Sequence, residues 1–257
     1  MSRHPIQYRE FVPHLRLRPF VECYWRVWGT VEASPKPERV VPDACPEIIF
    51  HCANPFRRQI GARWIVQRST FLAGTLSAPW RLKPGRRVDT VGVRFKPGMI
   101  TAMFPVVMSE MADRETELES FVPAVDVATL LAQLRNATPA RRVHLVDDWL
   151  LPRLEHRAPG GHSVTRTAVA LLLQSRGRRR VDDVASRLAV PRRRLERLFA
   201  RDLGIRPKLF ARIARLNHAL ARLEREERDG AVDAALAAGY FDQSHMSREF
   251  RNVAGRR

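Results

Sequence analysis

The stretch VDDVASRLAVPRRRLERLFARDLG, residues 181–204, decides the fold of the C-terminal part of this chain, because its pattern returns in AVDAALAAGYFDQSHMSREFRNVAG, residues 231–255. Each stretch begins with a segment rich in small residues and passes through a tight turn. Each then continues as an amphipathic segment with Arg on one side and large apolar residues on the other. This order predicts two helix-turn-helix units, and the second helix of such a unit fits the major groove of DNA.

The second helix of the first unit is expected over residues 192–201. Residues at i, i+3 and i+4 spacing should face the core: Leu195, Leu198 and Phe199, with Val184, Ala185 and Leu188 from the preceding helix. The opposite side, where base edges would lie, carries Arg193, Glu196, Arg197 and Ala200. Pro191 favours the first turn of this helix, and Gly204 closes it.

The segment PKLFARIARLNHALARLERE, residues 207–226, is expected to be one helix that connects the two units. Its apolar residues form one stripe: Leu209, Ile213, Leu216, Leu220 and Leu223. A helix of about 20 residues spans about 30 Å, close to the ~34 Å between successive major-groove faces. Both units could therefore contact one face of one duplex. In the second unit, Asp242 is expected to cap the second helix, while Met246 and Phe250 are buried.

Residues 1 to about 110 are expected to form strands and turns. Segments rich in β-branched and aromatic residues are separated by pairs such as Ser-Pro and Pro-Gly: residues 21–31, 47–52, 63–74 and 86–98. From residue 99 the apolar spacing becomes that of helices, notably at residues 124–136 and 140–154. These helices either pack on the β domain or form a dimer seam.

The predicted fold class is α+β. We expect an N-terminal β-rich barrel or sandwich domain for sensing or dimerisation at residues 1–157, with its helices within residues 99–154. Residues 158–162 contain Pro and two Gly and are expected to be the linker. Residues 163–257 are expected to form an all-α DNA-binding domain, with two helix-turn-helix units joined by a linker helix. Ser163 is its expected first cap, and Gly177 its first helix end.

The 257-residue chain carries a formal net charge of +18, mostly from Arg. Residues 162–257 hold 22 Lys/Arg against 11 Asp/Glu, as expected for a surface that meets phosphates. An Arg-rich composition throughout the genome is an alternative explanation, above all for the N-terminal part. We find no apolar run of membrane-spanning length and no signal peptide, so we expect a cytoplasmic protein with no membrane partner.

The two units resemble the AraC/XylS family of bacterial transcriptional regulators. The family pattern S-x-R-x-L-x-R-x-F is matched from Pro191 to Phe199, with Pro191 in place of the usual Ser, and G-x-x-P-x-x-[FY] is matched from Gly204 to Phe210. The second unit is similar to A-x-x-x-G-[FY]-x-D-x-S-[HY]-[FLM]-S-R-x-F-[KR] from Ala235 onward. This resemblance covers residues 163–255. The N-terminal part resembles, less closely, an uncharacterised domain that precedes such modules, and this implies no ligand.

The resemblance implies a transcription regulator whose two recognition helices read promoter DNA. Its implied base-contacting residues are Arg193, Glu196, Arg197, Gln243, Ser244, His245 and Arg248. Its candidates for phosphate contacts are Arg192, Arg194, Arg201, Lys208 and Arg251. Each of these DNA contacts has an alternative. Arg193 and Arg197 could lie on a solvated helix face, His245 could make a turn or core contact, and Arg248 could form an ion pair.

The second unit also departs from the family pattern. Ala231 and Ala234 stand where larger aliphatic residues are common, which predicts a thin core. The family's closing S/T-P-x-x-[YF]-R segment does not appear before Arg257. We therefore expect the first unit to anchor the duplex and the second to be marginal.

Several constellations in the N-terminal part favour structural roles. Four Trp residues either pack in the core, which is the favoured interpretation, or line a small-molecule pocket with Glu47 or Arg94: Trp25, Trp28, Trp64 and Trp80. Asp147 and Asp148 are interpreted as a solvated pair on a helix. No cofactor and no catalytic motif are expected.

The leading hypothesis is thus a sequence-specific regulator and not an enzyme. One alternative is a non-specific architectural DNA binder. Another is an N-terminal enzyme, such as a DNA-repair transfer reaction at Cys45. A metal site at Cys45, His51 and Cys52 is disfavoured, because strand spacing places Cys52 on the opposite face. Double-stranded DNA is the expected partner; RNA polymerase, a small-molecule effector and a second copy of the chain are further candidates.

Overall fold

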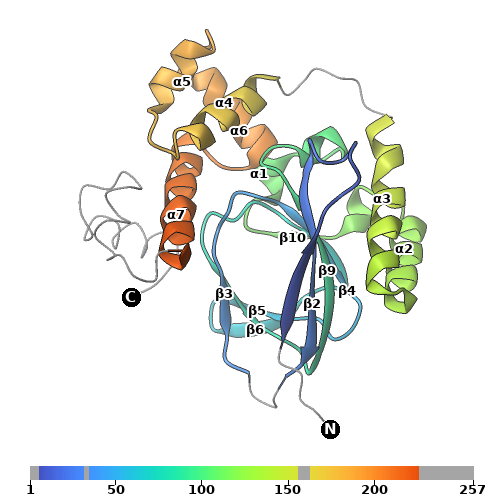
Figure 1. Ribbon diagram of the computed structural model, residues 1–257. Helices are drawn as coiled ribbons and strands as arrows, with labels where there is room; N and C mark the ends of the chain where they lie inside the picture. The colour runs from blue at the N-terminus through green and yellow to red at the C-terminus, as the bar shows by residue number, and fades with distance from the viewer. Residues whose placement is uncertain (1–5, 32–34, 156–162, 226–257) are drawn as a thin grey trace.

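The computed structural model describes residues 6–31, 35–155 and 163–225 and has the α+β architecture expected from the sequence (Figure 1). Its strands are β1 (Gln7–Phe11), β2 (Val21–Thr30), β3 (Glu38–Val40), β4 (Glu47–His51), β5 (Arg57–Ile60), β6 (Arg63–Val66), β7 (Thr70–Ala73), β8 (Trp80–Lys83), β9 (Arg87–Phe95) and β10 (Glu115–Thr116). Its helices are η1 (Ile100–Ala102), α1 (Met108–Met111), η2 (Leu118–Ser120), α2 (Ala124–Asn136), α3 (Pro139–Glu155), α4 (Ser163–Gln174), α5 (Val181–Arg187), α6 (Arg192–Leu203) and α7 (Pro207–Arg225).

The strands form two antiparallel sheets. One has the order β1-β2-β9-β4-β7-β10, and the other has the order β3-β8-β5-β6. Strand β4 is central in the larger sheet, where Glu47 lies opposite Arg94 on one side and Ala73 on the other. Both faces of β4 are covered, which explains why its sequence EIIFH is nearly continuous in apolar residues.

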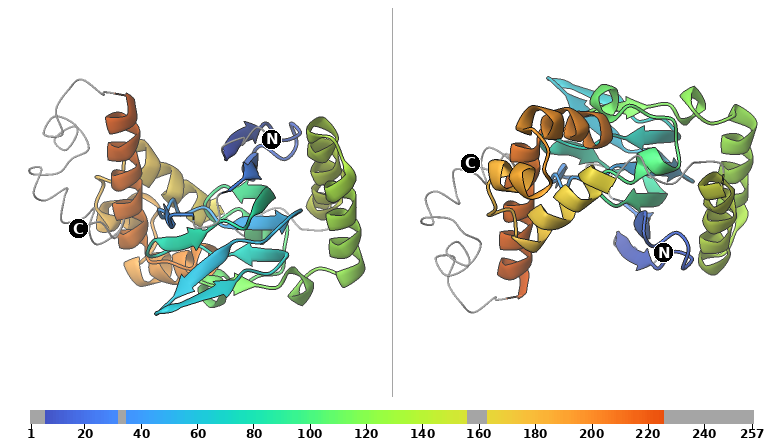
Figure 2. Two further views of the ribbon diagram at one scale, coloured as in Figure 1. Left: turned by 90° about the horizontal axis from the view of Figure 1, so that it is seen from below. Right: turned by 90° about the horizontal axis from the view of Figure 1, so that it is seen from above.

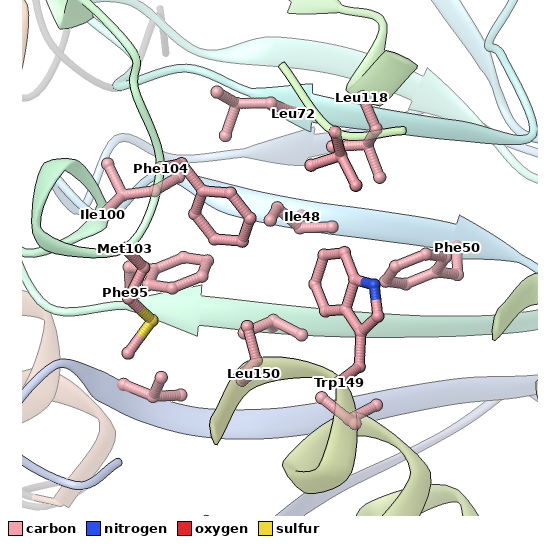
Figure 3. Packing of buried hydrophobic residues seen from close by; sticks show 14 of the residues in the cluster. Ile48, Phe50, Leu72, Phe95, Ile100, Met103, Phe104, Leu118, Trp149 and Leu150 are labelled. Atoms are coloured by element: carbon pink, nitrogen blue, oxygen red, sulfur yellow. The ribbon is translucent and has the colours of Figure 1, made fainter. Parts of the chain in front are cut away.

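A large hydrophobic core lies between the six-stranded sheet and helices α2 and α3, which cover one face of that sheet (Figure 2). Ile48 and Phe50 of β4 face this core together with Phe95 of β9. The Trp149 ring of α3 packs edge-on against Phe50, with 5.9 Å between ring centroids, and also contacts Phe104 (Figure 3). Of the two sequence-based alternatives for these helices, packing on the β domain is therefore correct.

Polar groups in this core also tie α3 to the sheet. The Arg142 guanidinium donates two hydrogen bonds to the Asp89 carboxylate of β9, at 2.8 and 2.9 Å. Asp147 accepts hydrogen bonds from the Tyr24 hydroxyl at 2.7 Å and from the His14 backbone N–H at 3.0 Å. The interpretation of Asp147 as solvated is wrong, because it lies on the sheet-facing side of α3; Asp148 is exposed as expected.

Helices α4 to α7 enclose a second hydrophobic core, to which α6 contributes Leu195, Phe199 and Leu203. The Phe199 ring packs edge-on against Phe210 of α7, with 5.8 Å between centroids. The Thr165 hydroxyl of α4 donates a 2.6 Å hydrogen bond to the buried Asp202 carboxylate. These contacts hold α6 from both sides.

The C-terminal end of α6 lies against α1 of the N-terminal part (Figure 1). Gly204 ends α6 with φ of +78°, in the left-handed region that favours glycine. A Cβ at this position would lie 2.4 Å from the Met108 carbonyl oxygen. The conformation and the close approach therefore both require glycine here. Gly177, the other predicted helix end, also has positive φ, at +71°, and its N–H donates to Leu172 O at 2.7 Å.

The expected linker and the second helix-turn-helix unit, residues 226–257, lie outside the described residues, and so does the expected cap by the Ser163 side chain. In the part of the chain that is described, no helix is both long and apolar enough to cross a membrane.

Candidate nucleic-acid interface and cavity

Helix α6 presents the basic residues of its first two turns to solvent. Arg193, Arg194 and Arg197 are exposed, whereas Leu195 and Phe199 on the opposite side are buried. None of the three arginines forms an ion pair with another described residue. Their guanidinium groups are therefore available for an external anion or a base edge.

Two further arginines of α6 are already engaged within the protein. Arg192 forms ion pairs with Asp182 of α5 and with Glu196, each at 3.0 Å. The Nε of Arg201 lies 2.7 Å from Oδ1 of Asp202. The pairs of Arg192 are solvent-exposed and contribute little to stability, so Arg192 and Glu196 can separate when a phosphate or base is near, whereas the Asp202 carboxylate that holds Arg201 is buried.

The turn between α5 and α6 fixes how α6 is presented. Ala189 adopts the left-handed conformation with φ of +50°, and the Val190 N–H donates to Ala185 O at 3.1 Å. Pro191 precedes α6 with φ of −59°, close to the value that its ring imposes, and supplies no side-chain cap. A preset backbone angle thus replaces the hydrogen-bonded Ser cap of the family pattern. Leu188 and Leu198, which were expected in the core, are only partly buried.

The remaining predicted contacts belong to the second unit and to the connector. Lys208 is exposed in the first turn of α7. Helix α7 has 19 residues, which corresponds to about 28 Å. The other predicted DNA contacts lie outside the described residues: Gln243, Ser244, His245, Arg248 and Arg251.

A cavity of about 270 Å³ lies between the two sheets of the N-terminal part. Glu47, Ile49 and His51 of β4 line it, because alternate residues of a strand face the same side. Aromatic rings from both sheets and their connecting loops complete the walls: Tyr8, Trp25, Phe56, Phe71 and Trp80.

The four Trp residues thus have different surroundings. Trp25 and Trp80 pack in a small hydrophobic cluster, as the favoured interpretation expects, and they also line the cavity together with Glu47 and Arg94. Trp28 lies under the Arg26 guanidinium, with 4.8 Å to its ring centroid, and Trp64 lies under the Lys83 ammonium at 4.3 Å. Neither of these two lines the cavity.

A charged cluster lies in the cavity wall. Nε of Arg94 donates to Oε1 of Glu47 at 2.7 Å, and the Trp25 indole N–H donates to the same oxygen at 3.0 Å. Oδ2 of Asp43 lies 3.5 Å from Arg94 Nε, and Oε1 of Glu10 lies 3.6 Å from Arg94 Nη1. Three carboxylates therefore share one guanidinium. Burial, only partly offset by Arg94, raises the pKa of Glu47 to about 7.

His51 supplies a buried neutral group on the same strand. Its side chain is 1% exposed, and burial lowers its pKa to about 4, so the imidazole is uncharged at pH 7. Nδ1 lies 2.9 Å from the Thr90 hydroxyl, and the nearby Gln67 side chain partly offsets the pKa shift, while Nε2 has no well-aligned hydrogen-bond partner among the described residues.

The cysteines occupy the faces that strand spacing predicts. Cys45 and His51 line the cavity, whereas Cys52 packs against the core beneath α2 and α3. Burial and then the nearby Asp43 raise the pKa of the Cys45 thiol well above its usual range. A protonated thiol is a poor nucleophile, so this environment does not favour transfer chemistry at Cys45. The described residues contain no cluster of three or more His, Cys, Asp or Glu suited to a metal ion.

Two family matches cover most of the chain. Residues 184–257 match a family described as a helix-turn-helix domain, and residues 9–117 match a domain of unknown function. The chain carries an AraC-type helix-turn-helix domain at residues 184–257. It is therefore a DNA-binding transcription regulator with double-stranded DNA as its partner.

No curated protein sequence matches this regulator. A solved structure of ToxT from Vibrio cholerae is similar to it with a TM-score of 0.49 and 9% sequence identity, over 96% of this chain and 94% of ToxT. At that level of similarity, no residue role passes from ToxT to the regulator.

The segment between β3 and β4 of the regulator contacts both the cavity and the DNA-binding helices. Asp43 lines the cavity, while the next residue, Ala44, is 1% exposed and packs in the core of α4 to α7. Val41 packs against the same core, and the carbonyl oxygen of Pro42 accepts a 3.1 Å hydrogen bond from the Asn217 side chain of α7. The cavity wall and the domain contact are thus parts of one short segment.

Several of these residues carry no signal in the sequence that would have singled them out. Tyr8, Asp43 and Phe56 reach the cavity through strand pairing and loop placement. Ala44 has a left-handed φ of +64°, which a Pro-Asp-Ala-Cys-Pro run between two strands can suggest but not specify.

Proposed function

We propose that the regulator reads promoter DNA with α6 in one major groove and with a second recognition helix, within residues 226–257, in the next. In this proposal residues 163–257 form the DNA-binding domain, residues 158–162 the linker, and residues 1–157 the sensing or dimerisation domain. The observation that carries it is the exposed set of Arg193, Arg194 and Arg197 on α6, which form no ion pair among residues 6–31, 35–155 and 163–225.

We assign Arg193 and Arg197 to base edges, because a guanidinium can donate two hydrogen bonds to O6 and N7 of guanine. Arg194 and Lys208 are assigned to phosphates, which set register and salt dependence. Arg192, Glu196 and Arg201 start in intramolecular pairs. Glu196 would reach a base once Arg192 turns to a phosphate. The second unit is assigned base contacts from Gln243, Ser244, His245 and Arg248, and a phosphate contact from Arg251.

The cavity is the proposed effector site. A molecule bound there would contact Asp43, and Ala44 and Pro42 beside it contact the helices that carry α6. An effector that prefers one placement of this segment would therefore bias the position of the DNA-binding helices. RNA polymerase and a second copy of the chain are the further partners proposed for promoter-bound protein.

The test begins with selection of duplexes from a random library by the full-length chain. Mobility shifts then compare a selected duplex with its scrambled form over a salt series. We expect Arg193→Ala and Arg197→Ala each to weaken binding at least about tenfold, and to relax preference at one base position. Arg63→Ala, an exposed arginine in the β5–β6 hairpin, removes the same charge and should stay within about twofold. Equal affinity for selected and scrambled duplexes would instead support the architectural alternative and overturn this proposal.

A further inference from the structure

The cavity wall formed by β4 has polar groups at its two ends and an apolar middle. Glu47, Ile49 and His51 all face the cavity. At about 3.3 Å per residue, the Cα atoms of Glu47 and His51 are about 13 Å apart along the strand. Aromatic rings surround the space between them: Tyr8, Trp25, Phe71 and Trp80. A ligand that fills this cavity therefore needs an apolar body with a polar group at one or both ends.

The Glu47 end has an excess of negative charge. Glu47, Asp43 and Glu10 all pair with Arg94, so that guanidinium is already shared. Both hydrogen bonds to Glu47 go to Oε1, and no described residue donates to Oε2. An anionic ligand would add a further acidic group to three carboxyl groups that already share one guanidinium, whereas a cation would favour the ionised form of Glu47. Burial raises the pKa of Glu47, Arg94 offsets this only in part, and the nearby Asp43 raises it further.

The His51 end has one unsatisfied polar atom. Nε2 of His51 is buried and has no well-aligned hydrogen-bond partner among the described residues, although the Gln67 side chain lies near the imidazole and buried polar atoms are nearly always paired. The imidazole is uncharged at neutral pH, so it can donate or accept one hydrogen bond according to its tautomer. This second, independent feature indicates that a polar group of a ligand completes the site.

We propose that the cavity binds a small arylalkyl ammonium ion, with the cation at Asp43 and Glu47 and the aromatic ring between Trp25 and Trp80. The Trp25 indole adjoins Glu47 through its hydrogen bond, so its ring can also contribute a cation–π contact. Members of this class that carry a ring hydroxyl opposite the ammonium-bearing chain would also form a hydrogen bond with Nε2 of His51. The biological effect of such a ligand rests on the proposed effector role, but its binding to the cavity is measurable without DNA.

Four compounds with similar bodies and different ends test the charge preference by calorimetry on the full-length chain: phenethylamine, 2-phenylethanol, 3-phenylpropionate and tyramine. We expect phenethylamine to bind at least about tenfold tighter than 2-phenylethanol, and 3-phenylpropionate to bind more weakly than either. Tyramine should bind tighter than phenethylamine, and His51→Leu should remove that gain. Equal binding of the amine and the acid, tighter binding of the acid, or binding of none of the four would overturn the proposal.

Variants locate the cation. Asp43→Asn removes a charge but keeps the side-chain oxygen that accepts the Cys45 N–H at 2.9 Å, and Glu47→Gln is the second variant. Each should weaken phenethylamine at least about tenfold and change 2-phenylethanol by less than about threefold. Asp148→Asn makes the same carboxylate-to-amide change on an exposed face of α3 and should have no effect. Near-UV circular dichroism of each variant verifies folding. If phenethylamine binding survives both cavity variants unchanged, the assigned site is wrong.

Mobility shifts with and without phenethylamine separate this inference from the proposed function. Amine binding that alters the affinity for the selected duplex supports both. Amine binding with unchanged DNA affinity supports the ligand class and contradicts the effector role. If no compound binds while the selected duplex still does, the ligand class fails and the reading of DNA by α6 stands.

Discussion

Asp43 lines the N-terminal cavity 3.5 Å from Arg94, and its neighbour Ala44 is buried among the DNA-binding helices. One peptide unit therefore joins the charged wall of the cavity to the contact between the two parts of the regulator. Ala44 holds this position with φ of +64°, a conformation that non-glycine residues adopt at some cost and that surrounding contacts must enforce. Contacts on both sides of the segment thus determine its geometry.

The contact between α6 and α1 should be sensitive to one methyl group. Gly204→Ala forces an L residue to φ of +78° and places Cβ 2.4 Å from the Met108 carbonyl oxygen. We expect a loss of about 3 kcal/mol in the free energy of unfolding, from backbone strain and overpacking together. Gly61→Ala is the matched control, because Gly61 has φ of +59° and nothing within 4 Å of its added Cβ. It should lose only about 1 kcal/mol. Equal losses in urea unfolding would contradict the close approach.

The pair between Arg142 and Asp89 should be a main stabiliser of α3 on the sheet. Arg142→Met leaves the Asp89 carboxylate with Arg26 alone, at 2.8 Å, and we expect a loss of about 3 kcal/mol. Arg141→Met changes the exposed neighbouring side chain and should stay within about 0.5 kcal/mol.

The pH dependence of that loss gives a second measurement. Although burial opposes it, hydrogen bonds from Arg142 and Arg26 hold the pKa of Asp89 below its usual range. A carboxyl group whose pKa is lower in the folded than in the unfolded protein stabilises the fold at pH values above its unfolded pKa. That stabilisation is lost as the pH falls from the unfolded pKa through the folded pKa. The difference between wild type and Arg142→Met should therefore shrink below about pH 3.9. A difference that stays constant to pH 2.5 would show that lost packing, and not the ion pair, causes the effect.

Substitutions of two arginines of α6 should change DNA binding in different ways. Arg194→Ala removes an assigned phosphate contact, so affinity should fall uniformly across sequences and the salt slope should decrease by about 1. Arg197→Ala removes an assigned base contact, so it should relax preference at one position by about 1–3 kcal/mol. Mobility shifts with the selected duplex and its point variants measure both. The same pattern from both variants would mean that α6 does not lie in the groove in the proposed orientation.

Binding of phenethylamine should strengthen with pH. Glu47 has a pKa of about 7, so its ionised fraction rises between pH 6 and 8, and the affinity for a cation should rise about tenfold. Arg94 stays charged over this range, and raised pKa values keep Tyr8 and Cys45 neutral. Two other carboxyl groups that face the guanidinium remain in Glu47→Gln: Glu10, and Asp43, whose pKa burial also raises.

Calorimetry in buffers of different ionisation enthalpy should show proton release on binding to the wild type near pH 7. Glu47→Gln should flatten the pH profile and remove most of that release. An affinity that is independent of pH in the wild type would place the cation away from Glu47.

The sequence determined the local features of the helix-turn-helix unit. Apolar spacing of 3.6 residues predicted the buried face of α6, and its observed bounds, Arg192–Leu203, differ from the predicted 192–201 only at the end. Helix α2 has the predicted bounds, and α7 is helical from Pro207 to Arg225, the last described residue of the predicted 207–226. These features depend on residues within about four positions of one another, so periodicity and turn residues suffice to predict them.

Tertiary structure alone decided the cavity, the ion pairs and the contact between the two parts. Glu47 and Arg94 meet because β4 pairs with β9, and Arg192 meets Asp182 because α5 packs on α6. Sequence periodicity shows that a residue is turned inward, but it does not distinguish a filled core from a cavity. That distinction depends on how side chains from strands and loops distant in the sequence fill the same space. For Trp25, Trp80 and Asp147, only the packed structure identifies the neighbours, and those neighbours determine each residue's role.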